Sequence, residues 1–255
     1  ERHAAVMTST FYRYNGTDFY AGGAERYLLD FKEVLARFGI KMVIYQYGAF
    51  PWIRRYQDID VVSLANRENF LQLLSREVIG KFNQNFYLAN AGRLLLAVYS
   101  AFYENWPLSL HPCIGISHGV SWDNFLVAYG DGFRFWEDNR AVIESLNTSD
   151  TVVSVDTNTA NWFQTIDYQA AQKILYIPNY VDLTQFSPRP DFTAPGEKII
   201  ILYPRRMYRA RGLYLVLGIL DRLLEKNPQV EFHFVGRGDE EDTRHVAEAQ
   251  AKWGS

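Results

Sequence analysis

Apolar and polar positions along the chain follow two periods in alternation, which predicts a series of α/β units. Short continuous apolar runs, typical of parallel strands buried on both faces, are separated by stretches with the 3.6-residue period of amphipathic helices. The clearest helix is 24–38, whose apolar residues share one face and whose end is marked by Gly39. Strands are predicted at residues 4–7, 41–47, 59–64, 113–117, 151–155, 174–177, 198–203 and 230–235.

The segment 67–105 is predicted to hold two helices, with the polar residues 83–85 between them. Its apolar stretch 94–103 is shorter than the ~20 residues that a membrane-spanning helix needs. We therefore interpret this stretch as part of a core helix. Further along the chain, helices are predicted at 213–226 and after the turn 236–242.

A proline-rich segment divides the chain into two parts. We predict an amino-terminal domain at 1–187, a hinge at 188–197 and a second domain that begins at 198 and continues to 255. The second part is short compared with the ~150 residues of a typical domain. We therefore expect an α/β fold with parallel sheets, in which the carboxyl-terminal domain is incomplete.

Composition excludes several classes of function. The net charge is −3, and a nucleic-acid binder with a general electrostatic footprint would be basic, so we expect no nucleic-acid partner. Cys113 is the single cysteine, which rules out an internal disulfide and a Cys-rich zinc site. Together with an amino terminus that lacks a signal-like pattern, it predicts a cytoplasmic location. The histidines show no metal-ligand spacing, and we expect no metal site.

An arginine-rich loop lies between the predicted strand 198–203 and the helix that Gly212 opens. Unpaired backbone N–H groups and the helix dipole make a helix N-terminus an anion site, and guanidinium groups fork onto phosphate oxygens. The loop therefore indicates a diphosphate-bearing ligand, and the alternative is a solvated basic loop. Its four arginines are Arg205, Arg206, Arg209 and Arg211.

Further candidates lie at other strand ends, where open α/β sheets gather ligand groups. His118 follows the strand 113–117 and could contact a ligand, although a lone histidine is more often structural. Asp123 is a weaker candidate nearby. The remaining candidates are glycines that would let a ligand approach the backbone or simply form turns, Gly22 and Gly23 before the first helix and Gly236 and Gly238 after the last strand.

The stretch 177–188, IPNYVDLTQFSP, resembles the IPNGVD-x-x-x-F-x-P signature of group 1 retaining glycosyltransferases. That family has the GT-B fold, in which two Rossmann-like domains face each other across a cleft. Its second domain begins with a strand followed by an arginine, four residues, a lysine and a glycine, and here Arg206 and Arg211 stand at the two basic positions. The segment 22–26, GGAER, is similar to the family's first-domain loop, and the His-Gly pair at His118 also matches.

The resemblance implies transfer of a sugar from a nucleotide diphosphate sugar to a glycan or glycolipid acceptor, with retention and without a metal or cofactor. It implies that Arg206 and Arg211 bind the donor diphosphate, with Gly22 and Gly23 approaching from the opposite wall, and that His118 orients the sugar as a catalytic residue. The family's paired glutamates have no counterpart here. The chain alone is therefore expected to be nearly inactive.

Two other functions remain open, a GT-B-fold sugar-nucleotide epimerase and a non-catalytic nucleotide-sugar-binding module. The epimerase would need acid and base carboxylates that do not stand out in the sequence. The aromatic and basic segment 50–58 suggests peripheral contact with the inner face of the membrane, although its two arginines are few for such a contact.

Overall fold

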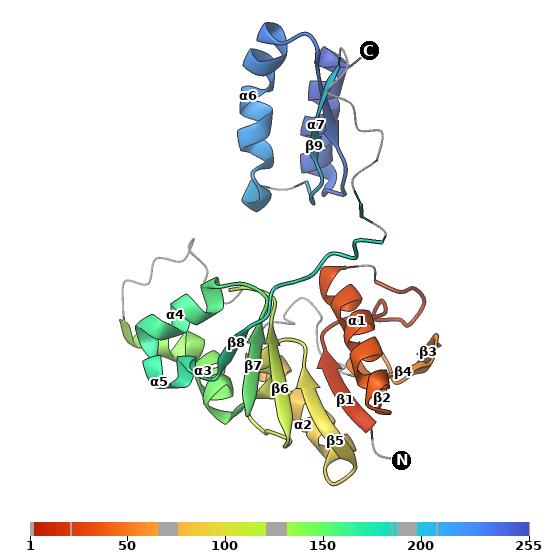
Figure 1. Ribbon diagram of the computed structural model, residues 1–255, viewed down its shortest axis with the longest axis vertical. Helices are drawn as coiled ribbons and strands as arrows, with labels where there is room; N and C mark the ends of the chain where they lie inside the picture. Colours follow the sequence, from red (N-terminus) through yellow and green to blue (C-terminus); the bar gives the residue numbers. More distant parts are fainter. Residues whose placement is uncertain are drawn as a thin grey trace. The chain divides into compact units, whose positions relative to one another are not determined.

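The computed structural model describes residues 3–20, 22–65, 76–120, 132–184, 186–187, 198–207 and 209–254. The chain divides into two compact units, Glu1–Tyr180 and Val181–Ser255 (Figure 1). The predicted hinge at 188–197 and the candidate Asp123 lie outside the described residues. Each unit is described by itself below.

The first unit is built on an eight-stranded sheet. Its strand order is β3-β4-β2-β1-β5-β6-β7-β8, and all neighbours are parallel except the edge pair β3 and β4. The strands are β1 (His3–Thr8), β2 (Lys41–Gly48), β3 (Ile53–Tyr56), β4 (Ile59–Ala65), β5 (Leu94–Tyr99), β6 (Cys113–Ser117), β7 (Thr151–Ser154) and β8 (Ile174–Tyr176).

Helices pack on both faces of this sheet. Figure 1 shows α1 on one face of the sheet and α2 on the other. Successive side chains of a strand point to opposite faces, so Val6 of β1 belongs to a core with Leu28 of α1, and Met7 belongs to a separate core with Phe82 of α2. A third core joins β7 to the remaining helices. The helices are α1 (Gly23–Arg37), α2 (Arg76–Asn90), the 3₁₀ helix η2 (Phe102–Asn105), α3 (Gly132–Thr148), α4 (Asn158–Ile166) and α5 (Tyr168–Ala171).

The prediction of two helices within 67–105 is wrong. Helix α2 continues through the polar segment 83–85, and β5 takes the place of the second helix, paired with β1 and β6 in the middle of the sheet. A short apolar run in a central strand has the same periodicity as a buried helical segment, which explains the error. Asn83 does not break α2 because its buried side chain donates to the carbonyl oxygens of Glu104 and Leu108.

Strand β3 falls within the aromatic and basic segment 50–58 and was not predicted. Its Arg54 donates through Nε to the carbonyl oxygen of Gly16 at 3.0 Å and lies over the Trp52 ring at 5.8 Å from the centroid. Nε of Arg55 lies 3.9 Å from Oδ1 of Asp60. Both arginines therefore contact groups of the protein itself. No helix within the described residues is long and apolar enough to cross a membrane.

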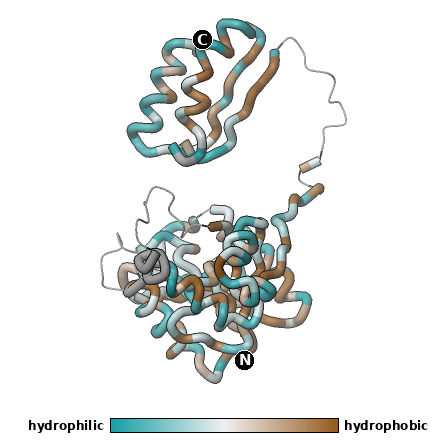
Figure 2. Tube along the Cα trace, turned by 90° about the vertical axis from the view of Figure 1, so that its left-hand side faces the viewer, coloured by the Kyte–Doolittle hydropathy of each residue, from teal (hydrophilic) through white to brown (hydrophobic). Residues whose placement is uncertain are grey.

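The second unit is a parallel βαβ motif followed by a helix. It contains β9 (Ile199–Tyr203), the 3₁₀ helix η3 (Arg209–Arg211), α6 (Leu213–Lys226), β10 (Val230–Phe234) and α7 (Glu240–Trp253). Its core is formed by Tyr203, Met207 and Leu213 with apolar residues of β10 and the two helices. Figure 2 shows hydrophobic stretches along the strands and helices of this unit.

The continuous apolar run of β9 predicts a strand buried on both faces, but in the structure only one face is buried. Ile200 and Leu202 are 59% and 54% exposed. Tyr203, on the other face, is buried against the helices. Within the described residues the sheet has two strands, and no described element covers the face that carries Ile200 and Leu202.

Candidate functional site

The arginine-rich loop connects the carboxyl end of β9 with the N-terminus of α6. Tyr203 is buried, and its hydroxyl lies 3.0 Å from the carbonyl oxygen of Arg211 and 3.4 Å from that of Arg206. The side chain of Tyr203 therefore holds the backbone of Arg206 and Arg211, the two arginines predicted to bind a diphosphate. The side chains of Arg205, Arg206, Arg209 and Arg211 all belong to exposed residues.

Gly236 and Gly238 form the turn after β10 and pack directly on the arginine-rich loop. A Cβ atom on Gly236 would lie 2.0 Å from the carbonyl oxygen of Arg205, and one on Gly238 would lie 2.7 Å from that of Met207. The amide of Met207 also donates to the carbonyl oxygen of Arg237 at 2.9 Å. These glycines therefore allow close backbone contact between the two turns, a role that the sequence could not separate from an ordinary turn.

The N-termini of α6 and α7 differ in their fitness for an anion. Gly212 precedes α6 in the left-handed region, with φ at 79°, and neither a capping side chain nor an acidic residue occupies the first turn. The first turn of α7 holds Glu240, Glu241 and Asp242, and Asp239 caps it. Because negative charge already fills the N-terminus of α7, the favourable end for a phosphate is that of α6, beside the arginines.

In the first unit, His118 follows β6 and contacts the first helix. Its ring packs edge-to-face on Tyr27 of α1, with the centroids 5.2 Å apart and the planes at 86°. The residue keeps an exposed surface, while desolvation by the surrounding protein lowers the pKa of the imidazole below its ordinary value. His118 is therefore neutral at pH 7, with a ring that can both donate and accept a hydrogen bond.

The two glycines before α1 have different surroundings. Gly22 precedes the helix in an extended conformation, and a Cβ atom there would lie 2.2 Å from Oε2 of Glu25. The buried Glu25 also accepts a hydrogen bond from Thr10 Oγ1 at 2.8 Å, so its carboxylate fills the space beside Gly22. A Cβ atom on Gly23 would meet nothing within 4 Å. The sequence did not indicate this difference, since Glu25 looks like an ordinary helix-starting residue.

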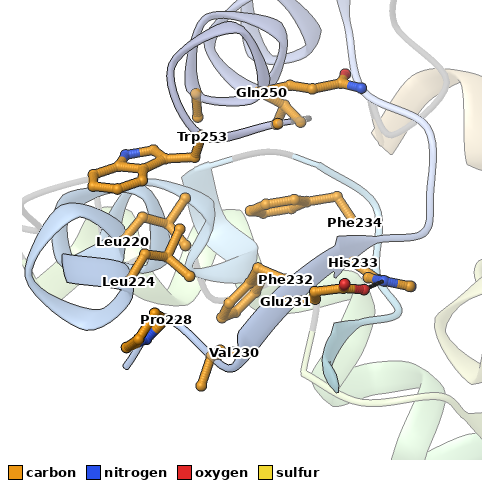
Figure 3. Close-up of a pocket in the computed structure, with 13 residues that line it drawn as sticks. Leu220, Leu224, Pro228, Val230, Glu231, Phe232, His233, Phe234, Gln250 and Trp253 are labelled. Atoms are coloured by element: carbon orange, nitrogen blue, oxygen red, sulfur yellow. Dashed lines mark hydrogen bonds and ion pairs between the residues drawn. The ribbon is translucent and has the colours of Figure 1, made fainter. Parts of the chain in front are cut away.

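A hollow of about 650 Å³ lies elsewhere in the second unit (Figure 3). It is lined by residues at the carboxyl ends of α6 and α7 and by β10, among them Leu224, Phe232 and Trp253. The arginines of the loop do not line it. The arginine-rich loop is therefore exposed and separate from this hollow.

No family model matches the chain, and no curated protein matches it significantly. Three solved structures of similar fold are informative. Sucrose-phosphate synthase from Thermosynechococcus elongatus is 17% identical, with a TM-score of 0.72 over 99% of this chain and 68% of that one.

An α,α-trehalose-phosphate synthase (UDP-forming) from Burkholderia vietnamiensis is 13% identical, with a TM-score of 0.55 over 99% of this chain and 67% of its own. WaaG, a glycosyltransferase involved in lipopolysaccharide biosynthesis, is 11% identical, with a TM-score of 0.55 over 98% of this chain and 68% of its own. The chain thus spans about two thirds of the length of these structures. It has the α/β fold with parallel sheets that glycosyltransferases of the GT-B type share.

Proposed function

We propose that this protein transfers a sugar from a nucleotide diphosphate sugar to a glycan or glycolipid acceptor, with retention of the anomeric configuration. The observation that carries the proposal is the arginine-rich loop at the N-terminus of α6, where no side chain caps the helix. The similarity to glycosyltransferases and to a UDP-forming synthase supports a nucleotide sugar as the donor. A cytoplasmic location is part of the same proposal.

Arg206 and Arg211 bind the donor diphosphate in this proposal. Their guanidinium groups would neutralise the charge that develops on the leaving diphosphate, together with the first backbone N–H groups of α6. Arg211 stands where the resembled family has lysine, and its planar fork can bind two phosphate oxygens at once. The hydroxyl of Tyr203 positions both arginines through their carbonyl oxygens.

His118 is assigned to the sugar. As a neutral imidazole at pH 7, it can donate a hydrogen bond to one sugar hydroxyl or accept one from another. Gly23 is assigned to close ligand approach, because the space above it is open, whereas the carboxylate of Glu25 fills the space beside Gly22. No metal or cofactor takes part in the proposed transfer step, so turnover should not depend on added Mg²⁺ or Mn²⁺.

The test is calorimetric titration with UDP of the wild type and of Arg206→Ala and Arg211→Ala. A charge-assisted hydrogen bond contributes about 1.5–3 kcal/mol, so each substitution should weaken binding roughly ten-fold to 150-fold. Arg205→Ala and Arg209→Ala are matched controls in the same loop, and their effect should be small. Unchanged affinity in both Arg206→Ala and Arg211→Ala would refute the assignment.

The second candidate is a non-catalytic nucleotide-sugar-binding module. It rests on the same arginine-rich loop at the N-terminus of α6, which would bind a diphosphate whether or not a sugar is then transferred. Incubation with a panel of nucleotide sugars, with and without acceptors, separates the alternatives. A transferase releases nucleoside diphosphate and glycosylates an acceptor, a binding module releases none, and an epimerase converts the sugar while the nucleotide stays attached.

A further inference from the structure

Three potential metal ligands meet at the amino-terminal edge of the large sheet. Cys113 is the first residue of β6, His111 lies two residues before it, and Asp150 directly precedes β7. One ligand atom from each residue lies within 4.8 Å of the other two. Strands rise ~3.3 Å per residue, so His118 at the opposite edge is roughly 17 Å away from Cys113. The cluster is therefore separate from the groups assigned to sugar transfer.

The spacing of the three ligand atoms is close to that of a tetrahedral zinc site. Nδ1 of His111 lies 2.9 Å from Oδ2 of Asp150 and 3.9 Å from Sγ of Cys113. Bond lengths of ~2.0–2.3 Å to zinc place neighbouring ligand atoms roughly 3.3–3.6 Å apart in a tetrahedron. Shifts of about half an ångström would therefore bring both pairs to coordination distance.

Backbone and side-chain donors surround the ligands. The amide of Asp150 lies 3.5 Å from Sγ of Cys113, and the amide of Cys113 donates to Oδ2 of Asp150 at 2.8 Å. Nδ2 of Asn105 lies 4.0 Å from the same sulfur and donates to Ser149 Oγ at 3.1 Å. Such donors stabilise a thiolate and fix the orientation of ligands around a metal.

Access and charge also suit a divalent ion. The side chains of His111 and Asp150 are about half exposed, at 52% and 51%, whereas Cys113 is buried at the base of the cluster. An ion could therefore enter from solvent and keep a water molecule as fourth ligand. A neutral imidazole, a thiolate and a carboxylate together balance the charge of one divalent cation.

We propose that His111, Cys113 and Asp150 form a structural site for a zinc-like divalent cation that joins the starts of β6 and β7. The sequence did not reveal it, because Asp150 is far from the other two ligands along the chain and only the pairing of β6 with β7 brings them together. A Cys-rich site remains excluded by the single cysteine. The simpler alternative is a hydrogen-bonded trio that holds no ion.

The experiment is a Co²⁺ titration of the reduced protein, prepared without a polyhistidine tag and treated with a chelator. We expect one equivalent to bind with a thiolate-to-cobalt charge-transfer band and the visible bands of tetrahedral Co²⁺. Cys113→Ser should abolish the charge-transfer band. His111→Ala should weaken binding about 100-fold or more, because loss of even an outer-shell partner of a metal site costs 10–100-fold.

His233→Ala is the matched control. His233 and Glu231 form another exposed histidine–carboxylate pair, 3.4 Å apart, without a thiol beside them, and binding should be unchanged in this variant. Because His111 is half exposed, His111→Ala should keep the fold even if Cys113→Ser does not, and circular dichroism checks this. A missing charge-transfer band in the wild type, or equal Co²⁺ affinity in His111→Ala and wild type, would overturn the proposal.

Discussion

Glu104 should make the stability of the first unit fall as pH rises towards 8. This residue lies in η2, is only 3% exposed, and its Oε2 has no hydrogen-bond partner among the described residues. Burial raises the pKa of the carboxyl to about 8, against an ordinary value of 4.5, and a hydrogen bond from the backbone of Ala101 offsets part of this shift. Glu104→Gln replaces the carboxyl with a neutral group of the same shape.

The magnitude follows from proton linkage. Between pH 4.5 and pH 8 the folded protein keeps the Glu104 proton, whereas the unfolded chain has lost it. The folded state therefore binds more protons, and its stability decreases with pH by about 1.4 kcal/mol per pH unit in this window. Below pH 4.5 this contribution to stability is fully present. Across the window the loss amounts to roughly 3–5 kcal/mol.

The assay is urea unfolding of wild type and Glu104→Gln at pH 5, 6.5 and 8, with hydrogen exchange of β5 as a local probe. As pH rises, the unfolding free energy of the wild type should fall relative to that of Glu104→Gln by about 1.4 kcal/mol per pH unit. Tyr47→Phe is the matched control, because burial and the nearby Glu104 raise the pKa of Tyr47 well above this window. Tyr47→Phe should change the unfolding free energy by the same amount at every pH. An equal difference for Glu104→Gln at pH 5 and pH 8 would refute the reasoning.

Two predictions concern the backbone of the arginine-rich loop. Gly236→Ala should weaken UDP binding at least ten-fold without loss of helix content, because the new Cβ would lie 2.0 Å from the carbonyl oxygen of Arg205 and must displace the loop. Calorimetry measures the affinity and circular dichroism the helix content. Unchanged affinity would contradict the prediction. Gly212→Ala should lower the unfolding free energy of the second unit by about 1–2 kcal/mol, since φ at 79° is unfavourable for a residue with a Cβ. Urea denaturation measures this free energy, and an unchanged midpoint would count against the prediction.

The sequence predicts the fold correctly where the hydrophobic period and the residues that begin or end an element agree. Strand β6 and helix α6 have the predicted bounds, because an apolar run in one and a 3.6-residue pattern in the other are each closed by a break. Strand β5 was mistaken for a helix, since a short apolar run does not distinguish a central strand from a buried helical turn. The exposure of β9 could not be predicted either, because burial depends on what covers a strand as well as on its own residues.

The candidate site was predictable only as a set of positions along the chain. The four arginines stand out through their place between a strand and a helix, which is a local pattern. Tyr203, which ties Arg206 and Arg211, and Tyr27, which packs on His118, look like ordinary core residues in the sequence. Their roles depend on hydrogen bonds and ring contacts that appear only when the elements are packed together.

The two edges of the parallel sheets carry different kinds of chemistry. At the carboxyl edge, His118 and the arginine-rich loop belong to exposed residues at turns, so substitutions there should change ligand binding more than stability. At the amino edge, the carboxylate of Asp150 accepts from both the amide of Cys113 and the ring of His111, which joins the starts of β6 and β7. Substitutions in this cluster should therefore change stability and cation binding while nucleotide affinity stays the same. The parallel direction of the strands accounts for this division, because it places the carboxyl ends of all parallel strands at one edge and their amino ends at the other.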